Sequence, residues 1–343
     1  MKAAVYYTPE DIRYEERTVP QIGEEEVLLR LRACGLCGTD IYKATHQTVP
    51  SGTVLGHEIS GDIVEVGDKV TGFQKGDRVY VAHHVPCFTC DFCQRGFYTM
   101  CSQFSATNVE PGGFSEYIRV PALHVKHTMG KLPNDVSYEQ GAMVEPVACC
   151  LHGFERAPVH PGDVVLIMGA GQIGCIQLQL AKHYLAKKVM ITDVNENRLL
   201  KAKELGADAV LNPSSEQIVS RVLDETNGKG ADLVIISVGS SALLKEAFQV
   251  VSRGGTILVF AHFPKGDVPI PADRFFNDEV KVVGAYSSHP YHYEEALQLL
   301  KQEVVNTEQM VTHRFPLSKL LGAIECAKHP KGQSVKIMMS PDE

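Results

Sequence analysis

The chain has 343 residues, of which 44% are hydrophobic and 22% are charged, and its formal net charge is −8 at pH 7. This length exceeds what one hydrophobic core usually serves, so we expect two domains. The negative charge argues against nucleic-acid and membrane partners, because binding to phosphate groups needs a basic face. No run approaches the roughly 18 apolar residues that a membrane span requires.

The ten cysteines indicate metal ligands more than disulfides. No apolar signal-peptide region develops at the start of the chain, where charge appears at Glu10. We therefore expect a soluble, cytoplasmic protein whose thiols are reduced.

Short β-like runs, broken by Gly and Pro, fill the chain to about residue 150. Residues 26–32, 61–67 and 77–82 are examples. This spacing predicts an all-β barrel or sandwich.

Apolar strands alternate with longer amphipathic segments from about residue 160. The predicted strands are 164–168, 188–192, 209–211, 233–236 and 256–260. This alternation predicts a parallel sheet covered by helices. We expect three segments, namely 1–150, 151–284 and 285–343, with a helix from Tyr293 to about Glu303 in the last, which returns to the first domain.

A glycine-rich turn follows the strand that ends at Met168. A Gly-x-Gly-x-x-Gly pattern between a strand and a helix allows a tight turn, lets the backbone approach a pyrophosphate and offers free N–H groups to the phosphates. We predict a dinucleotide site here. Its members are Gly169, Gly171, Gln172, Ile173 and Gly174.

Asp193 ends the next predicted strand, 19 residues after Gly174. A carboxylate at this place can hydrogen-bond the ribose 2′-hydroxyl of NAD and would repel the 2′-phosphate of NADP, so NAD is the predicted cofactor. The alternative is that Asp193 only caps the following helix. We place Arg198 along the adenosine.

Four cysteines form a Cys-x2-Cys-x2-Cys-x7-Cys pattern. Four thiolates so close together predict a tetrahedral zinc site with no open position, which is structural. An iron–sulfur cluster lacks its usual companions here. The ligands are Cys87, Cys90, Cys93 and Cys101.

A second set of metal-binding residue types is dispersed along the first 150 residues. Taken singly, each member has an ordinary explanation. Cys34 and Cys37 could form a redox pair, His57 could be a core histidine, and Glu145 could be a carboxylate at a helix start.

The order of these motifs resembles that of the zinc-containing medium-chain dehydrogenases along the whole chain. The motifs are Cys-Gly-Thr-Asp at 37–40, Gly-His-Glu at 56–58, the four cysteines, Glu-Pro at 145–146 and the glycine turn. Within that family, the chain resembles the polyol (sorbitol-type) and threonine dehydrogenases more than the simple alcohol dehydrogenases. The resemblance implies an α/β fold in which a GroES-like β-barrel domain carries both zinc sites beside a Rossmann doubly wound parallel-sheet domain.

The resemblance also implies a catalytic zinc site. Its expected ligands are Cys37, His57, Glu58 and Glu145, and whether Glu58 or Glu145 is the direct ligand stays open. Cys149 is a rival, because simple alcohol dehydrogenases hold a cysteine where Glu145 stands.

Proton transfer and cofactor contacts complete the expected site. Thr39 is placed to take the substrate proton first. Tyr42 stands where the family usually has a histidine, and His46 in the following loop could replace it. Further residues expected at the cofactor are Ala261, His262, Ala285 and Tyr286.

The predicted function is zinc-dependent transfer of hydride from a secondary alcohol to NAD, in a homo-oligomer (dimer or tetramer). Related enzymes tend to carry a substrate-binding arginine where 286–288 reads Tyr-Ser-Ser, so an uncharged polyol, cyclitol or sugar alcohol is favoured. Two alternatives remain. One is oxidation of an amino-acid alcohol, as by threonine 3-dehydrogenase, and the other is a non-catalytic zinc scaffold.

Overall fold

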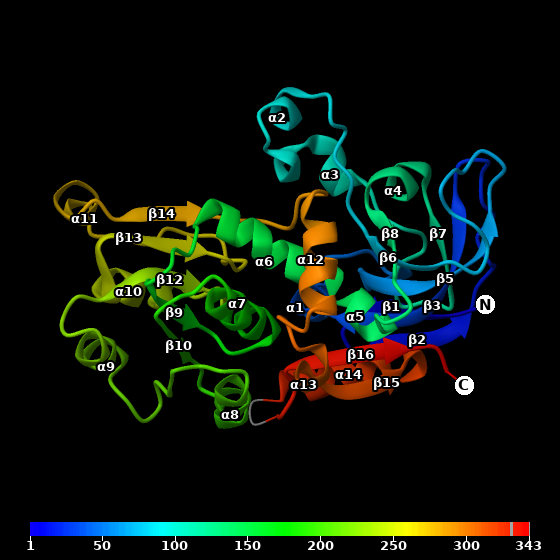
Figure 1. The fold of residues 1–343 in the computed structure, drawn as a ribbon. Helices are drawn as coiled ribbons and strands as arrows, with labels where there is room; N and C mark the ends of the chain where they lie inside the picture. Colours follow the sequence, from blue (N-terminus) through cyan, green and yellow to red (C-terminus); the bar gives the residue numbers. More distant parts are fainter. Residues whose placement is uncertain (330–331, 343) are drawn as a thin grey trace.

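The computed structural model describes residues 1–329 and 332–342, and it shows two β-sheet regions with helices between them (Figure 1). The first region has a seven-stranded sheet in the order β15-β16-β3-β5-β6-β8, with β7 paired to β3, and a small sheet in the order β2-β1-β4. The strands are β1 (Lys2–Thr8), β2 (Asp11–Glu16), β3 (Val27–Leu36), β4 (Thr53–Val54), β5 (Glu58–Val66), β6 (Arg78–Ala82), β7 (Tyr117–Val120), β8 (Met129–Lys131), β15 (Val311–Pro316) and β16 (Lys336–Ser340).

The second region is a six-stranded parallel sheet in the order β11-β10-β9-β12-β13-β14. The order reverses between β9 and β12, which is the doubly wound arrangement whose crevice receives dinucleotides. The strands are β9 (Val164–Met168), β10 (Lys188–Thr192), β11 (Ala209–Leu211), β12 (Ala231–Ile236), β13 (Val251–Val259) and β14 (Lys281–Gly284).

Helices cover both faces of this sheet because successive strand residues point to opposite sides. Val165 and Ile167 of β9 join the hydrophobic cluster on one face, whereas Leu166 and Met168 join the cluster on the other. The first face packs against α6 (Val144–Arg156), α7 (Gln172–His183), α8 (Glu196–Glu204) and α12 (His292–Lys301), and the second against α9 (Ile218–Glu225) and α10 (Ser241–Val250).

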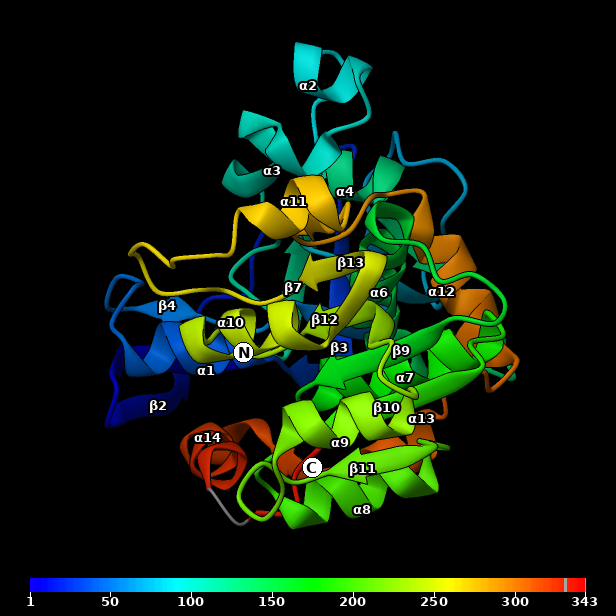
Figure 2. The ribbon, with the colours of Figure 1, turned by 90° about the vertical axis from the view of Figure 1, so that its left-hand side faces the viewer.

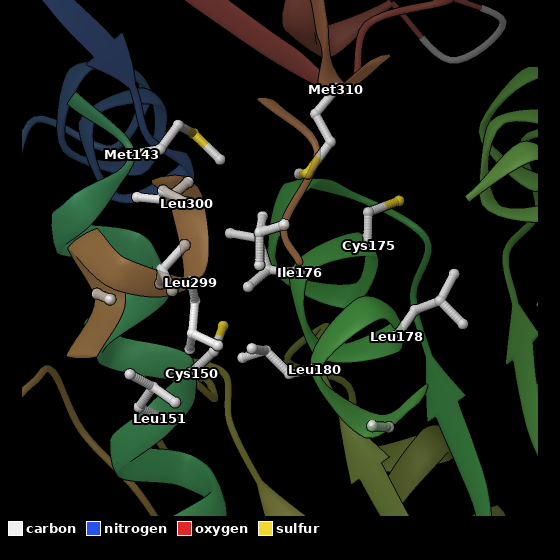
Figure 3. Packing of buried hydrophobic residues seen from close by; sticks show 14 of the residues in the cluster. Met143, Cys150, Leu151, Cys175, Ile176, Leu178, Leu180, Leu299, Leu300 and Met310 are labelled. Carbon is white, nitrogen blue, oxygen red and sulfur yellow. The ribbon is translucent and has the colours of Figure 1, made fainter. Parts of the chain in front are cut away.

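Helix α6 connects the two regions, and ten of its 13 residues are buried. Cys150 of α6 belongs to the same hydrophobic cluster as Leu299 of α12 and Leu180 of α7, whose side chains flank it in Figure 3. The same cluster includes Tyr80 and Met338 from strands of the first region. The two regions therefore share one continuous core.

The remaining helices are short. Those around the four cysteines stand out from the body of the molecule, at the top of both views (Figures 1 and 2). They are α2 (Asp91–Gln94), η1 (Tyr98–Met100) and α3 (Ser102–Ala106). Elsewhere lie α1 (Gly38–Thr45), α4 (Ala122–His127), α5 (Tyr138–Ala142), α11 (Asp273–Asn277), α13 (Thr307–Met310), η2 (Leu317–Lys319) and α14 (Leu320–Lys328).

The C-terminal strand lies in the first region, far from the preceding Rossmann-type strands. β16 runs antiparallel to β3, with Met338 opposite Gly35, and β15 runs parallel to β16. Over residues 1–329 and 332–342, the structure contains no helix that combines the length and the apolar character needed to cross a membrane.

The α/β fold class expected from the sequence is confirmed, and β9, β10 and β11 have the predicted bounds. β13 begins at Val251, five residues before the expected start, because Arg253-Gly254-Gly255 interrupts the apolar pattern. β14 is not among the predicted strands, because its apolar run is limited to Val282-Val283 and its side chains are largely exposed.

Candidate metal and dinucleotide sites

The four cysteines of the projecting segment converge. Their sulfur atoms all lie within 4.8 Å of one another, with 3.9 Å between those of Cys87 and Cys93 and 3.6 Å between those of Cys90 and Cys93. A tetrahedral site with zinc–sulfur bonds of about 2.3 Å places its sulfurs about 3.8 Å apart. The segment therefore fits a closed tetrathiolate zinc site.

The ionisation of these thiols is uneven. A hydrogen bond from the Thr89 hydroxyl lowers the pKa of Cys87 to about 5, whereas burial raises the pKa of Cys93 to about 12. A metal ion that binds all four sulfurs must displace the remaining protons, which couples metal binding to the fold of the segment.

The second predicted metal set converges in part. Cys37 precedes α1, while His57 and Glu58 lie at the start of β5, and one donor atom of each lies within 4.8 Å of the others. Among the described residues, this group contains only these three. Glu145 is also buried, but it belongs to the first turn of α6, and its Oε1 accepts a hydrogen bond of 3.4 Å from the Cys149 thiol.

Asp40 positions two of these three groups, a role that its sequence motif alone does not reveal. Its carboxylate is buried and accepts hydrogen bonds from the backbone N–H groups of Cys37 and Gly56, both at 3.1 Å. Its Oδ1 lies 3.2 Å from Nδ1 of His57. A histidine held through Nδ1 presents Nε2 to a metal, as metal-binding histidines commonly do.

Glu58 forms a fully buried ion pair with Lys336 of β16, and both side chains are 0% exposed. Gln172, the first residue of α7, connects the two. Its Nε2 donates to Glu58 Oε1 at 3.1 Å, and its Oε1 accepts from Lys336 Nζ at 3.0 Å. Gly35 leaves the room that this pair occupies, since a Cβ there would lie 1.8 Å from Glu58 Oε2.

The glycine turn has the geometry that a bound pyrophosphate requires. Gly169 has a φ of +116°, and a Cβ on Gly174 would lie 1.8 Å from the carbonyl oxygen of Gly169. A Cβ on Gly171 would instead meet open space, so the backbone here is accessible to a ligand at the N-terminus of the 12-residue helix α7. Ile173 packs against the hydrophobic core.

Asp193 does not cap the helix after it. Asn195 is the N-cap of α8, and its side chain accepts from the backbone of Asn197 and Arg198. Asp193 instead accepts from the N–H of Ala170 at 2.8 Å and from the N–H of Asn195 at 2.9 Å. It thus joins the glycine turn to the end of β10, where a ribose diol would lie.

Arg198 extends toward the C-terminal segment. Its Nε donates to the carbonyl of Ser334 at 3.1 Å and its guanidinium also reaches the carbonyl of Ala327 at 3.5 Å. The expected contact with adenosine remains a prediction.

The other predicted residues surround the region between α1 and the parallel sheet. Thr39 is exposed, and its N–H donates to Cys37 Sγ at 3.4 Å. The Tyr42 ring stacks on His46 at 4.3 Å and lies 4.9 Å from that of His262, which follows Ala261 after β13. Ala285, after β14, donates its N–H to Val259 at 3.2 Å, and the adjacent Tyr286 is 53% exposed.

Known protein families match two parts of the chain. The model of the alcohol dehydrogenase GroES-like domain matches residues 23–133, and that of the zinc-binding dehydrogenase matches residues 173–302. The sorbitol dehydrogenase of Bacillus subtilis (strain 168) is 31% identical over 349 residues, which cover 100% of this chain and 98% of that protein.

Solved structures share the whole fold. A zinc-binding dehydrogenase from Sinorhizobium meliloti 1021 bound to NADP has a TM-score of 0.90 and 28% identity, with 99% of each chain covered. An alcohol dehydrogenase from Escherichia coli CFT073 in complex with NADH has a TM-score of 0.89 and 26% identity, also with 99% of each chain covered. These matches confirm a GroES-like domain combined with a Rossmann-type domain.

The buried ion pair predicts a large stability effect. In zinc-free protein, Lys336→Met should lower the free energy of unfolding by about 3–5 kcal/mol, because Glu58 would stay buried without its charged partner. Lys69→Met is the control. It removes one half of the exposed pair with Glu24, whose side chains are 62% and 68% exposed, and should cost less than about 1 kcal/mol. Urea unfolding measures both, and equal costs would contradict this account of the ion pair.

The two metal groups predict separable losses. Cys93→Ser should remove one zinc and lower the melting temperature, because that site holds the projecting segment together. Cys37→Ser should also remove one zinc but leave a folded protein with little turnover. Zinc analysis, calorimetry and an NADH absorbance assay on both variants test this. A fully active Cys37→Ser protein would refute the assignment.

Proposed function

Since the chain belongs to the zinc-dependent medium-chain dehydrogenases, we propose that it oxidises a secondary hydroxyl of a small polyol, cyclitol or sugar alcohol with NAD. The observation that carries the proposal is the convergence of Cys37, His57 and Glu58 beside the first residue of the glycine-turn helix. The expected products are a ketone and NADH.

Cys37, His57 and Glu58 would hold the catalytic zinc, and their donor set of thiolate, imidazole and carboxylate suits that ion. Bound zinc would stabilise the substrate as an alkoxide, and NAD would accept the hydride. Asp40 keeps His57 in the required tautomer, and Lys336 limits the positions that the Glu58 carboxylate can take.

Glu145 would act beside the metal rather than on it. Burial raises its pKa to about 6, and the Cys149 thiol donates to its Oε1. At neutral pH most of it is ionised, so it can accept a hydrogen bond from a substrate hydroxyl or a water. Its position outside the group of three donors favours Glu58 as the direct ligand and leaves Cys149 as a partner of Glu145.

The proton would leave through α1. Thr39 stands near Cys37 in the first turn of α1 and is exposed, whereas His46 is the C-cap at the other end of this helix, where its Nδ1 contacts the Thr45 hydroxyl at 3.0 Å. Tyr42 connects these positions by stacking on His46. An imidazole is the commoner general base in enzymes, so we assign the release of the proton to His46 rather than Tyr42.

The substrate class follows from the relatives and from the local charge. The matched Bacillus subtilis protein is a sorbitol dehydrogenase. The buried cation nearest the proposed zinc, Lys336, is already paired with Glu58, which disfavours an amino-acid substrate whose carboxylate needs a cation. We also propose a cytoplasmic homo-oligomer, in which the partly exposed edge strand β14 is available to a second copy.

Cofactor choice depends on Asp193. The similar structures include one with NADP and one with NADH, so the fold accommodates both. The ratio of kcat/KM for NAD over NADP should fall at least about 10-fold in Asp193→Ala, because the charge that repels a 2′-phosphate is lost. Asp193→Asn removes the negative charge but keeps an oxygen that can accept the hydrogen bond from the N–H of Ala170. It therefore distinguishes the effect of the charge on cofactor choice from the effect of the hydrogen bond on the glycine turn. Preference for NADP by the unmodified enzyme would overturn the assignment.

Glu145 has a direct test. Glu145→Gln should keep the fold and NAD affinity but lower turnover of sorbitol, or of the best polyol found, by about 100-fold, as losses near a metal commonly do. Cys149→Ala is the matched control, and it should change turnover only a few-fold. If Glu145 merely stabilises the start of α6, its substitution should cost about 1 kcal/mol of stability and leave turnover intact. Steady-state rates and melting temperatures decide between the two roles.

A further inference from the structure

Another cluster of metal-binding side chains lies outside both predicted zinc sites. His152 and Glu155 belong to the second half of α6, and His289 lies in the loop before α12. One donor atom of each lies within 4.8 Å of the other two. His292, the first residue of α12, approaches the same carboxylate, with its Nε2 3.7 Å from Glu155 Oε2.

The distances suit one small ion. Bonds of about 2.0–2.1 Å to nitrogen and oxygen in a tetrahedron place neighbouring donors about 3.3 Å apart. His289 Nδ1 lies 3.3 Å from Glu155 Oε2. The rings of His289 and His292 stack at 5.4 Å, and the ring of His152 lies 4.1 Å from that of His289. Two imidazoles and one carboxylate, of His152, His289 and Glu155, form a donor set typical of divalent transition metals, and the imidazole of His292 lies next to them.

The imidazoles have the protonation that a metal requires. Burial lowers the pKa of His289 to about 3 and lowers the pKa values of His152 and His292 as well, so all three are neutral at pH 7. His152 Nδ1 donates to the carbonyl of Ser287 at 3.0 Å, which leaves its Nε2 with a lone pair.

Solvent and charge both favour a cation. Glu155 is 52% exposed, and together with His292 it lines a surface pocket of about 220 Å³, so an ion can enter from outside. Arg156 is the nearby positive charge, and its guanidinium lies over the Phe97 ring at 5.7 Å. The cluster itself carries the single negative charge of Glu155, which excludes an anion as its natural ligand.

We propose that His152, Glu155, His289 and His292 form a third metal site, which binds a divalent transition ion such as Zn²⁺. His152 stands seven residues beyond Glu145 on α6, or about 10.5 Å along the helix, so the site is distinct from the catalytic one. The bound ion joins α6 to the loop before α12. The Tyr98 ring, within the four-cysteine segment, meets the His289 ring edge-on at 5.1 Å, so the ion also supports the base of that segment.

The test uses the enzyme with its two other zinc sites filled. Zinc chloride is titrated into it by calorimetry, and zinc per chain is measured after equilibration with a small excess and desalting. The unmodified enzyme should retain three zinc ions, and Glu155→Gln and His289→Gln should retain two. Each substitution should weaken this third binding event at least about 10-fold, which is the smaller loss seen even for outer-shell partners of a metal.

His160→Ala provides the control. His160 lies 3.4 Å from Asp163 but is 70% exposed, so it represents an ordinary surface pair of histidine and carboxylate. It should leave the third binding event unchanged. Two zinc ions per chain in the unmodified enzyme would overturn the proposal, and so would a third ion that both variants bind as tightly as the unmodified enzyme.

The readout is independent of the proposed reaction. Glu155 is half exposed, so Glu155→Gln should fold and keep its turnover within about twofold, as surface substitutions usually do. Loss of the third ion with normal turnover supports the site. If the unmodified enzyme does not oxidise any polyol with NAD, that result counts against the proposed function and not against the third metal site.

Discussion

The buried ion pair between Glu58 and Lys336 is the constraint on which the two regions depend. Removing two charges from water costs several kcal/mol for each ion, and only a close partner and further hydrogen bonds offset that cost. Here the partners come from β5, β16 and the start of α7. The charges are satisfied only when the C-terminal strand has joined the first sheet and the glycine-turn helix has packed against it. The dinucleotide turn is thereby fixed beside the proposed zinc ligands.

Helix α6 carries residues of two proposed metal sites along the junction between the two β-sheet regions. Its first turn carries Glu145 beside the proposed catalytic zinc, and its last turns carry His152 and Glu155 of the proposed third site. Between them, apolar side chains such as Cys150 belong to the core that both sheet regions share (Figure 3). A rigid, largely buried helix is a suitable support for such groups, because side chains that are locked by packing hold their geometry.

The sequence predicts the features that a short stretch of residues specifies, such as apolar strands and short motifs. It does not predict contacts between residues that are far apart in the chain. β9 and β10 are buried on both faces, so their continuous apolar runs identify them. The edge strand β14 has only Val282-Val283 as an apolar run, and its side chains are largely exposed. Cys37, His57 and Glu58 stand in short motifs. Lys336, however, meets Glu58 across 278 residues, and a lysine in a C-terminal strand gives no sign that it is buried. The resemblance supplied Glu145 as a possible ligand, and only the three-dimensional arrangement separates it from Glu58.

The ligand set of the proposed catalytic zinc can be observed directly. Anomalous diffraction at the zinc edge, on crystals of the enzyme grown with NAD, locates the ion and its neighbours. We expect an ion about 2.0–2.3 Å from Cys37 Sγ, a nitrogen of His57 and an oxygen of Glu58, with Glu145 farther away and Lys336 still paired to Glu58. An ion bound by Glu145 or Cys149 in place of Glu58 would contradict this expectation.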